Sequence, residues 1–172
     1  MMQKMPLKNF LWRAPLTTEE ITQYDAATSE KGYFLEVDVE IPTHLHNYFN
    51  DLPPFPETID ITESMASPST KKARADSNRF RDGCKFSCPK LAPNLNPKYR
   101  YKCHISALQL FLSLGCILVK VHRVLEFTHA EWLSPYIWHN TIKRQQSQSD
   151  FSRKYFKLMN NAFFGKCMEV RI

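Results

Sequence analysis

Residues 32–41 carry the clearest short-range alternation of apolar and acidic side chains in the chain. Their sequence, GYFLEVDVEI, alternates apolar and acidic side chains with a repeat of two residues, which is the period of a β-strand with one buried and one solvent-facing row. We therefore predict a strand here, with Glu36, Asp38 and Glu40 on a solvated edge face. Pro42 ends the strand because proline has no backbone N–H to donate.

A stretch rich in proline and polar residues follows this strand. Prolines at positions 53, 54 and 56 exclude a helix interior or a central strand. Residues 62–82 are small, polar and charged, and they offer little apolar surface to bury. Another proline-rich piece ends at residue 97. We predict a flexible linker and loop over 62–97, which separates a part at 1–61 from a part at 98–172.

The second half is richer in regular hydrophobic patterns. Residues 104–114 have apolar side chains at helical spacing, and Gly115 fits a C-terminal cap. Residues 116–127 are rich in Val, Ile and Leu, which favours a partly buried strand. Residues 131–146 and 149–168 then follow a helical period on either side of a short polar turn. The fold class predicted from these patterns is α+β with a helical hairpin near the C-terminal end.

Composition fits a globular intracellular protein. Hydrophobic residues make up 43% of the 172 residues, and no run approaches the roughly 18 apolar residues of a membrane span. The first ten residues lack the layout of a signal peptide. The five cysteines are odd in number and scattered, which favours reduced thiols. We expect a chain that is neither secreted nor bound to a membrane.

Positive charge is concentrated near the C-terminal end. Residues 140–172 hold seven Lys or Arg against Asp150 and Glu169, so this segment carries +5 of the chain's net charge of +6. A short segment with that much positive charge suits an anionic partner, of which phosphate is the commonest. A solvated basic helix is the alternative interpretation.

The predicted last helix has two different sides when its residues are placed 100° apart. The open side has two cations, two amides and one aromatic ring, without an acid: Arg153, Lys157, Asn160, Asn161 and Phe164. The side predicted to pack is apolar: Tyr155, Phe156, Leu158, Met159, Ala162 and Phe163. A flat ring beside cations suits a nucleotide, because aromatic rings stack on bases.

The run KLMNNAFFGK at residues 157–166 resembles motif B of family B DNA polymerases, whose pattern is Lys, three residues, Asn-Ser, one residue, Tyr-Gly. Lys157, Asn161 and Gly165 match in register. Ala162 and Phe164 replace the usual Ser and Tyr, so two hydroxyls are missing. Residues 115–140 are similar to the region before motif B in protein-primed polymerases of viruses and self-synthesising DNA transposons. Residues 32–53 look like the palm and its insertion in the same family, and residues 2–10 look like the segment after motif A.

This resemblance implies a partial palm strand and insertion followed by a helical fingers hairpin. Motif A and motif C would lie outside the chain, so no catalytic residue and no metal ligand is assigned, and Mg²⁺ would be held only in the full-length enzyme. Lys157 would contact the triphosphate, Asn161 and Phe164 would line the nucleotide pocket, and Gly165 would allow close packing. Two further candidates for holding phosphates rest on charge and position: Arg144 and Arg153.

The expected function is therefore that of a fragment of a DNA-directed DNA polymerase, a nucleotidyltransferase of DNA replication that is inactive by itself. Its expected partners are primer-template DNA, deoxynucleoside triphosphates and a terminal priming protein. A non-catalytic nucleotide-binding or nucleic-acid-binding module derived from such a polymerase is the alternative.

Three other interpretations are weaker. Glu36, Asp38 and Glu40 could in principle coordinate a hard cation, but the resemblance places motif A elsewhere. The set Cys84, Cys88, Cys103 and His104 lacks a usual zinc-finger spacing, so accidental thiols are favoured over a zinc-dependent interaction protein. The basic cluster at residues 71–74 resembles a nuclear address, but short basic runs in loops are mostly just solvated, so a solvated loop is the favoured interpretation.

Overall fold

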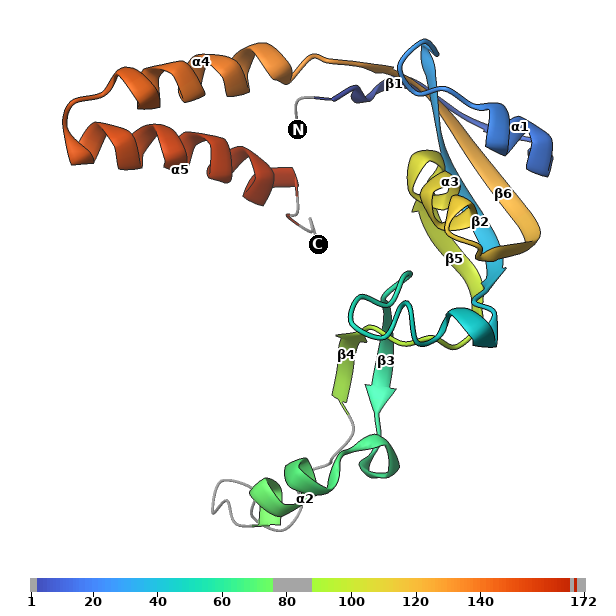
Figure 1. Cartoon of the computed structure of the whole chain (residues 1–172). Helices are drawn as coiled ribbons and strands as arrows, with labels where there is room; N and C mark the ends of the chain where they lie inside the picture. Colours follow the sequence, from blue (N-terminus) through green and yellow to red (C-terminus); the bar gives the residue numbers. More distant parts are fainter. Residues whose placement is uncertain (1–2, 76–87, 168, 170–172) are drawn as a thin grey trace. The chain divides into compact units, whose positions relative to one another are not determined.

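A computed structural model describes residues 3–75, 88–167 and 169, and Figure 1 shows its course. The strands are β1 (Met5–Arg13), β2 (Lys31–Glu40), β3 (Glu57–Ile61), β4 (Cys88–Ala92), β5 (Lys98–His104) and β6 (Ile117–Ala130). The α-helices are α1 (Thr18–Gln23), α2 (Pro68–Ala75), α3 (Ile105–Ser113), α4 (Ser134–Gln146) and α5 (Asp150–Cys167). Two short 3₁₀ helices are η1 (Thr43–Leu45) and η2 (Glu63–Met65).

These elements form two compact units. One contains residues 1–35, 104–106 and 123–172, and the other contains residues 36–103 and 107–122. The main sheet has four strands in the order β1-β6-β2-β5, and β1 pairs antiparallel with β6. A separate two-stranded antiparallel sheet joins β3 to β4. The mixture of helices and antiparallel sheets confirms the predicted α+β class.

The first unit is built around the ring of Phe127, which is fully buried in β6. The centroid of this ring lies 5.0 Å from that of Phe34, 5.8 Å from that of Phe10 and 6.1 Å from that of His104. Gly32 in β2 leaves room for the ring, because a Cβ at this position would lie 2.4 Å from Cε2 of Phe127. The glycine is therefore required by packing.

Helix α1 begins with a capping box that the sequence analysis did not use. The Thr17 hydroxyl accepts the backbone N–H of Glu20, and the Glu20 carboxylate accepts the backbone N–H of Thr17. Two N–H groups at the helix start are satisfied in this way. Ile21 is the buried residue of this short helix.

The second unit has an apolar core and a buried lysine. Phe55 is almost fully buried, and its ring centroid lies 4.4 Å from that of Phe111 and 5.3 Å from that of Tyr101. The side chain of Lys98 is fully buried, and its Nζ lies 2.7 Å from a carboxylate oxygen of Glu57. A buried ammonium needs such a partner, because removing an unpaired charge from water is costly.

The longer predicted elements are confirmed within one to three residues at most of their ends: β2, α3, β6, α4 and α5. Several elements were not predicted, namely β1, α1, β3, α2, β4 and β5. β3 begins directly after Pro56, and α2 and β4 form within the segment predicted as linker and loop. Residues 76–87 of that segment lie outside the described residues. β3 and β4 are about 30 residues apart in sequence, and their pairing has no short-range signal. Among the described residues, no helix has both the length and the apolarity needed to cross a bilayer.

Candidate functional site

The predicted site residues all lie on the hairpin formed by α4 and α5, which run side by side in opposite directions (Figure 1). Residues 147–149 make the turn. The Ser149 hydroxyl accepts the backbone N–H of Ser152, and this interaction caps the start of α5. The Nε–H of Arg153 donates to the carbonyl of Ser147 at 3.0 Å. Arg153 therefore fixes the turn as well as carrying charge.

Specific contacts determine which side of α5 faces α4. The amide Nδ2 of Asn140 donates to Oδ1 of Asn160 at 2.9 Å, and Asn140 is only 3% exposed. The ring of Phe163 contacts those of Trp132 and Tyr136, with centroid distances of 5.7 and 6.3 Å. Asn160 and Phe163 are three residues apart, so they mark one side of the helix.

This geometry corrects part of the predicted division of α5. Phe156, Met159 and Phe163 are half-buried, in agreement with the prediction, but Tyr155 and Leu158 are exposed. Ala162 is also exposed, and Asn160 belongs to the side that faces α4 rather than to the open side. The prediction assumed that α5 is covered on all of its apolar side. Among the described residues α4 covers only one part of it, and α5 has no fully buried residue.

Four of the predicted site residues share one exposed side of α5. Arg153, Lys157, Asn161 and Phe164 are all exposed and follow one another at intervals of four, four and three residues. That spacing places them along one side of a helix over about 16 Å, given a rise of about 1.5 Å per residue. The structure thus places these side chains together and leaves them accessible.

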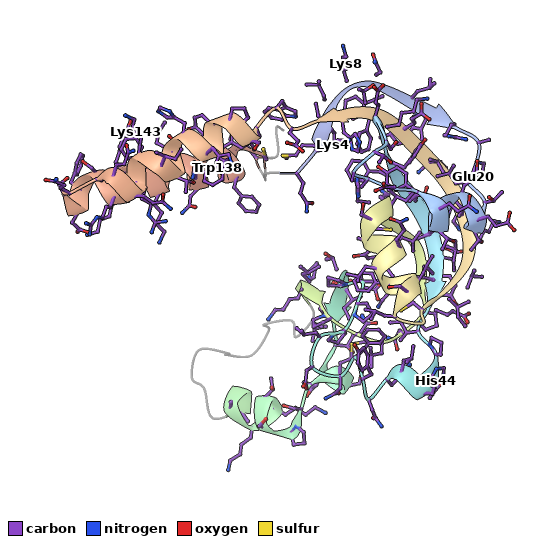
Figure 2. The ribbon with its side chains drawn as sticks, turned by 45° about the horizontal axis from the view of Figure 1, so that its top comes forward. Lys4, Lys8, Glu20, His44, Trp138 and Lys143 are labelled. Carbon is purple, nitrogen blue, oxygen red and sulfur yellow. The ribbon has the colours of Figure 1, made fainter. Side chains whose placement is uncertain are left out.

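The fifth residue, Arg144, comes from α4. It lies one turn beyond Asn140, on the side of α4 that carries the contact to Asn160, and it is exposed in the last turn of the helix. Lys143, which precedes it in that turn, is labelled in Figure 2. Because the helices are antiparallel and joined by a short turn, the end of α4 lies beside the beginning of α5. Arg144 therefore comes from the same end of the hairpin as Arg153.

The cations of this surface are not neutralised by nearby acids in the described part of the chain. Asp150 pairs with Lys154 at 2.7 Å, and Glu169 pairs with Lys166. Within residues 3–75, 88–167 and 169, no ion pair joins Arg144, Arg153 or Lys157 to a carboxylate. An anion with several oxygens would find three cationic side chains available here.

Gly165 has open space where a side chain would point. A Cβ built on it meets nothing within 4 Å, and the residue lies inside α5. Glycine inside a helix costs about 0.5–1 kcal/mol relative to alanine. Since the described chain does not need a glycine here, this position is suited to the close approach of another molecule.

The acidic row of β2 does not form the solvated edge face that the sequence analysis predicted. β2 lies between β6 and β5 inside the sheet, and Glu36 is buried. Glu36 approaches the guanidinium of Arg100 at 3.7 Å, and Asp38 contacts Nε2 of His122 at 2.8 Å. The backbone N–H of Arg100 also donates to Asp38, and it holds the pKa of that carboxyl below its ordinary value, with His122 adding to the effect. Two of these three acids therefore already have partners in the sheet.

The proposed thiol cluster can be judged only in part. Cys84 and the side chain of Cys88 lie outside the described residues. Burial raises the pKa of the Cys103 thiol to about 11, so the free thiol is protonated at neutral pH. Among the residues that the structure describes, no three His, Cys, Asp or Glu side chains are arranged to hold a metal ion.

One functional candidate, Asn140, was missed by the sequence analysis. The segment containing Asn140 was predicted correctly as a helix, but the asparagine itself was not singled out. Its position three residues after Ile137, on the buried side of α4, was the clue available. A polar residue on the buried side of a helix requires a hydrogen-bond partner.

Comparison with protein-family models, with curated proteins and with solved structures finds no match for this chain. The resemblance to protein-primed family B polymerases therefore stays a hypothesis that rests on the sequence of residues 2–10, 32–53, 115–140 and 157–166. The geometry of the hairpin is independent of that resemblance.

Proposed function

We propose that this chain is a fragment of a protein-primed family B DNA polymerase, whose α4–α5 hairpin binds the incoming deoxynucleoside triphosphate and the DNA during replication. The observation that carries the proposal is the accessible side of α5, where Lys157, Asn161 and Phe164 lie together without an acid among the described residues. The motif-like run at residues 157–166 supplies these same side chains.

Each residue type suits one part of a nucleotide. The Lys157 ammonium acts as a point charge toward the triphosphate, and the guanidinium groups of Arg144 and Arg153 offer planar, bidentate donors. The exposed ring of Phe164 provides a surface for the base or sugar, and the Asn161 amide provides both a donor and an acceptor. Gly165 leaves space next to them.

Catalysis requires parts that these residues do not provide. Nucleotidyl transfer in such polymerases uses two metal ions held by aspartates. Glu36 and Asp38 do not fit this task, because they are engaged with Arg100 and His122. Among the described residues, no group of three His, Cys, Asp or Glu side chains is arranged to hold a metal ion. Mg²⁺ and its ligands would belong to other segments of the full-length enzyme, together with the primer-template DNA and the priming protein.

The direct test is calorimetric titration of the 172-residue chain with a deoxynucleoside triphosphate, using Lys157→Ala and a matched control. Lys154→Ala is the control, because Lys154 is an exposed lysine on the same helix that is already paired with Asp150. Hydrogen bonds to charged groups contribute about 1.5–3 kcal/mol, so Lys157→Ala should weaken binding about 10- to 150-fold while Lys154→Ala leaves it nearly unchanged. Equal affinities for the parent chain and Lys157→Ala would refute the assigned role.

A primer-extension assay on the same preparation tests whether the chain catalyses nucleotide transfer by itself. We expect nucleotide binding without extension. Extension by this chain alone would show that its catalytic carboxylates are present and were not recognised. Recovery of extension when the flanking coding sequence is restored would favour the polymerase, whereas continued inactivity would favour the alternative of a non-catalytic binding module.

A further inference from the structure

Helix α5 carries two apolar stripes, and among the described residues only one of them packs against α4. Phe156, Met159 and Phe163 are half-buried and follow one another at helical spacing, and Phe163 contacts Tyr136 of α4. A second stripe at intervals of four, three and four residues stays open: Phe151, Tyr155, Leu158 and Ala162. The first three residues of this second stripe are 77%, 46% and 63% exposed. The stripes lie about 100° apart around the helix, so hydrophobic contact alone does not select between them.

Two polar contacts join α4 to α5 in the observed packing. The Tyr136 hydroxyl donates to the Met159 carbonyl at 3.5 Å in an exposed position, whereas the hydrogen bond between Asn140 and Asn160 is shorter and partly buried, so it distinguishes the two packings more strongly. Asn140 is 3% exposed, and its amide donates to Asn160 at 2.9 Å. If α5 turned by about 100° to bury the other stripe, Asn140 would face apolar side chains such as Leu158. An unpaired buried amide disfavours that packing by a factor of about 5 to 150.

We infer that Asn140 is a positioning residue that sets the rotation of α5 about its own axis, and thereby turns the nucleotide-binding side of α5 outward next to Arg144. The effect of this rotation on nucleotide binding rests on the proposed function. The rotation itself can be observed without a nucleotide. A 100° turn would carry Lys157, Asn161 and Phe164 through the same angle, away from the end of α4 that holds Arg144. Buried polar pairs that select one packing over another are known from helical assemblies.

The test replaces both amides with leucine, Asn140→Leu together with Asn160→Leu, so that neither packing leaves an orphaned polar group. Trp132 is the reporter, because its ring contacts Phe163 at 5.7 Å only while the observed side of α5 faces α4. The chain has three tryptophans, so 5-fluorotryptophan labelling gives three fluorine NMR signals. We expect the Trp132 signal of the double variant to split or shift, while resistance to urea is kept.

Nucleotide affinity provides the second readout. If only a fraction of the variant holds α5 in the observed rotation, the apparent dissociation constant rises by the inverse of that fraction. The population measured from the Trp132 signals should therefore predict the loss of deoxynucleoside triphosphate affinity. A purely structural role would instead make the affinity follow resistance to urea.

Two controls separate the possible outcomes. Gln145→Leu adds an apolar side chain at an exposed position of α4 and should leave a single parental Trp132 signal. Asn160→Asp keeps the acceptor for Asn140, so it should also keep that signal, and it serves as the decisive variant if the double leucine variant fails to fold. An unchanged Trp132 signal in a folded double variant would overturn the inference, as would loss of the parental signal in Asn160→Asp. If the parent chain binds no nucleotide, the proposed function fails while the Trp132 spectra still decide the role of Asn140.

Discussion

Replacing Gly32 by alanine should destabilise the chain through a single steric contact. The new Cβ would lie 2.4 Å from Cε2 and 2.8 Å from Cζ of Phe127, and 3.1 Å from Nδ1 of His129. Contacts this short force atoms to move. Phe127 has little freedom to do so, because it is fully buried and lies among the rings of Phe34 and His104. The strain therefore falls on the packing of β2 against β6.

The size of the effect follows from two opposing contributions. Overpacking a well-filled core costs about 1–3 kcal/mol. Alanine also lowers the entropy of the unfolded chain relative to glycine, which stabilises the folded state by about 0.4–1 kcal/mol. The midpoints of these two ranges differ by about 1.3 kcal/mol, which is the decrease in the free energy of unfolding that we expect for Gly32→Ala.

The assay is urea unfolding followed by circular dichroism, with Gly165→Ala as a matched control. Gly165 has open space around it, so alanine there should stabilise the helix by about 0.5–1 kcal/mol, with the opposite sign to Gly32→Ala. Phe127→Leu should remove most of the penalty of Gly32→Ala, since the ring atoms that clash are gone. A Gly32→Ala variant as stable as the parent, or a penalty that persists in the Phe127→Leu background, would show that the steric argument is wrong.

Two further predictions concern charged and titratable groups. Lys98→Met should lower the free energy of unfolding by about 1–3 kcal/mol, because Glu57 and Asn94 lose the ammonium group that they contact. The cost stays in this range because the Glu57 carboxylate is partly exposed to water. Unchanged resistance to urea would contradict this prediction. Burial, and secondarily the neighbouring His129, lowers the pKa of His104, so the folded state favours the neutral ring. The contribution of the neutral His104 ring to the stability of the folded state is complete above the ordinary pKa of about 6.5. It is lost as the pH falls below this value, because the unfolded state then binds a proton more readily than the folded state. His104→Gln should flatten the fall in unfolding midpoint between about pH 7 and pH 5, and a slope equal to that of the parent would count against the assignment.

The elements that could be predicted from sequence are those with strong local signals. α4, α5 and β6 each have a long hydrophobic period, and β2 has a clear alternation. β5 has the polar sequence KYRYKCH, and one of its stabilising contacts is the hydrogen bond from Arg100 to Asp38, 62 residues earlier in the chain. Such strands depend on distant partners, so a local pattern does not reveal them. α1 is different, because its capping box at Thr17 and Glu20 was present in the sequence and would have indicated the helix.

The candidate site shows the same division between local and distant information. Periodicity along α5 groups Arg153, Lys157 and Phe164 on one side, and the structure leaves that side open. Periodicity does not say which of two apolar stripes packs against α4, and it placed Asn160 on the wrong side. Asn140, twenty residues before Asn160, selects between the two stripes. Its buried amide needs a hydrogen-bond partner, and it finds one in Asn160 when α5 has the observed rotation. A helix that presents a binding surface therefore needs a constraint from a neighbouring element, and in this hairpin the constraint is polar because the apolar contacts do not discriminate between the two orientations.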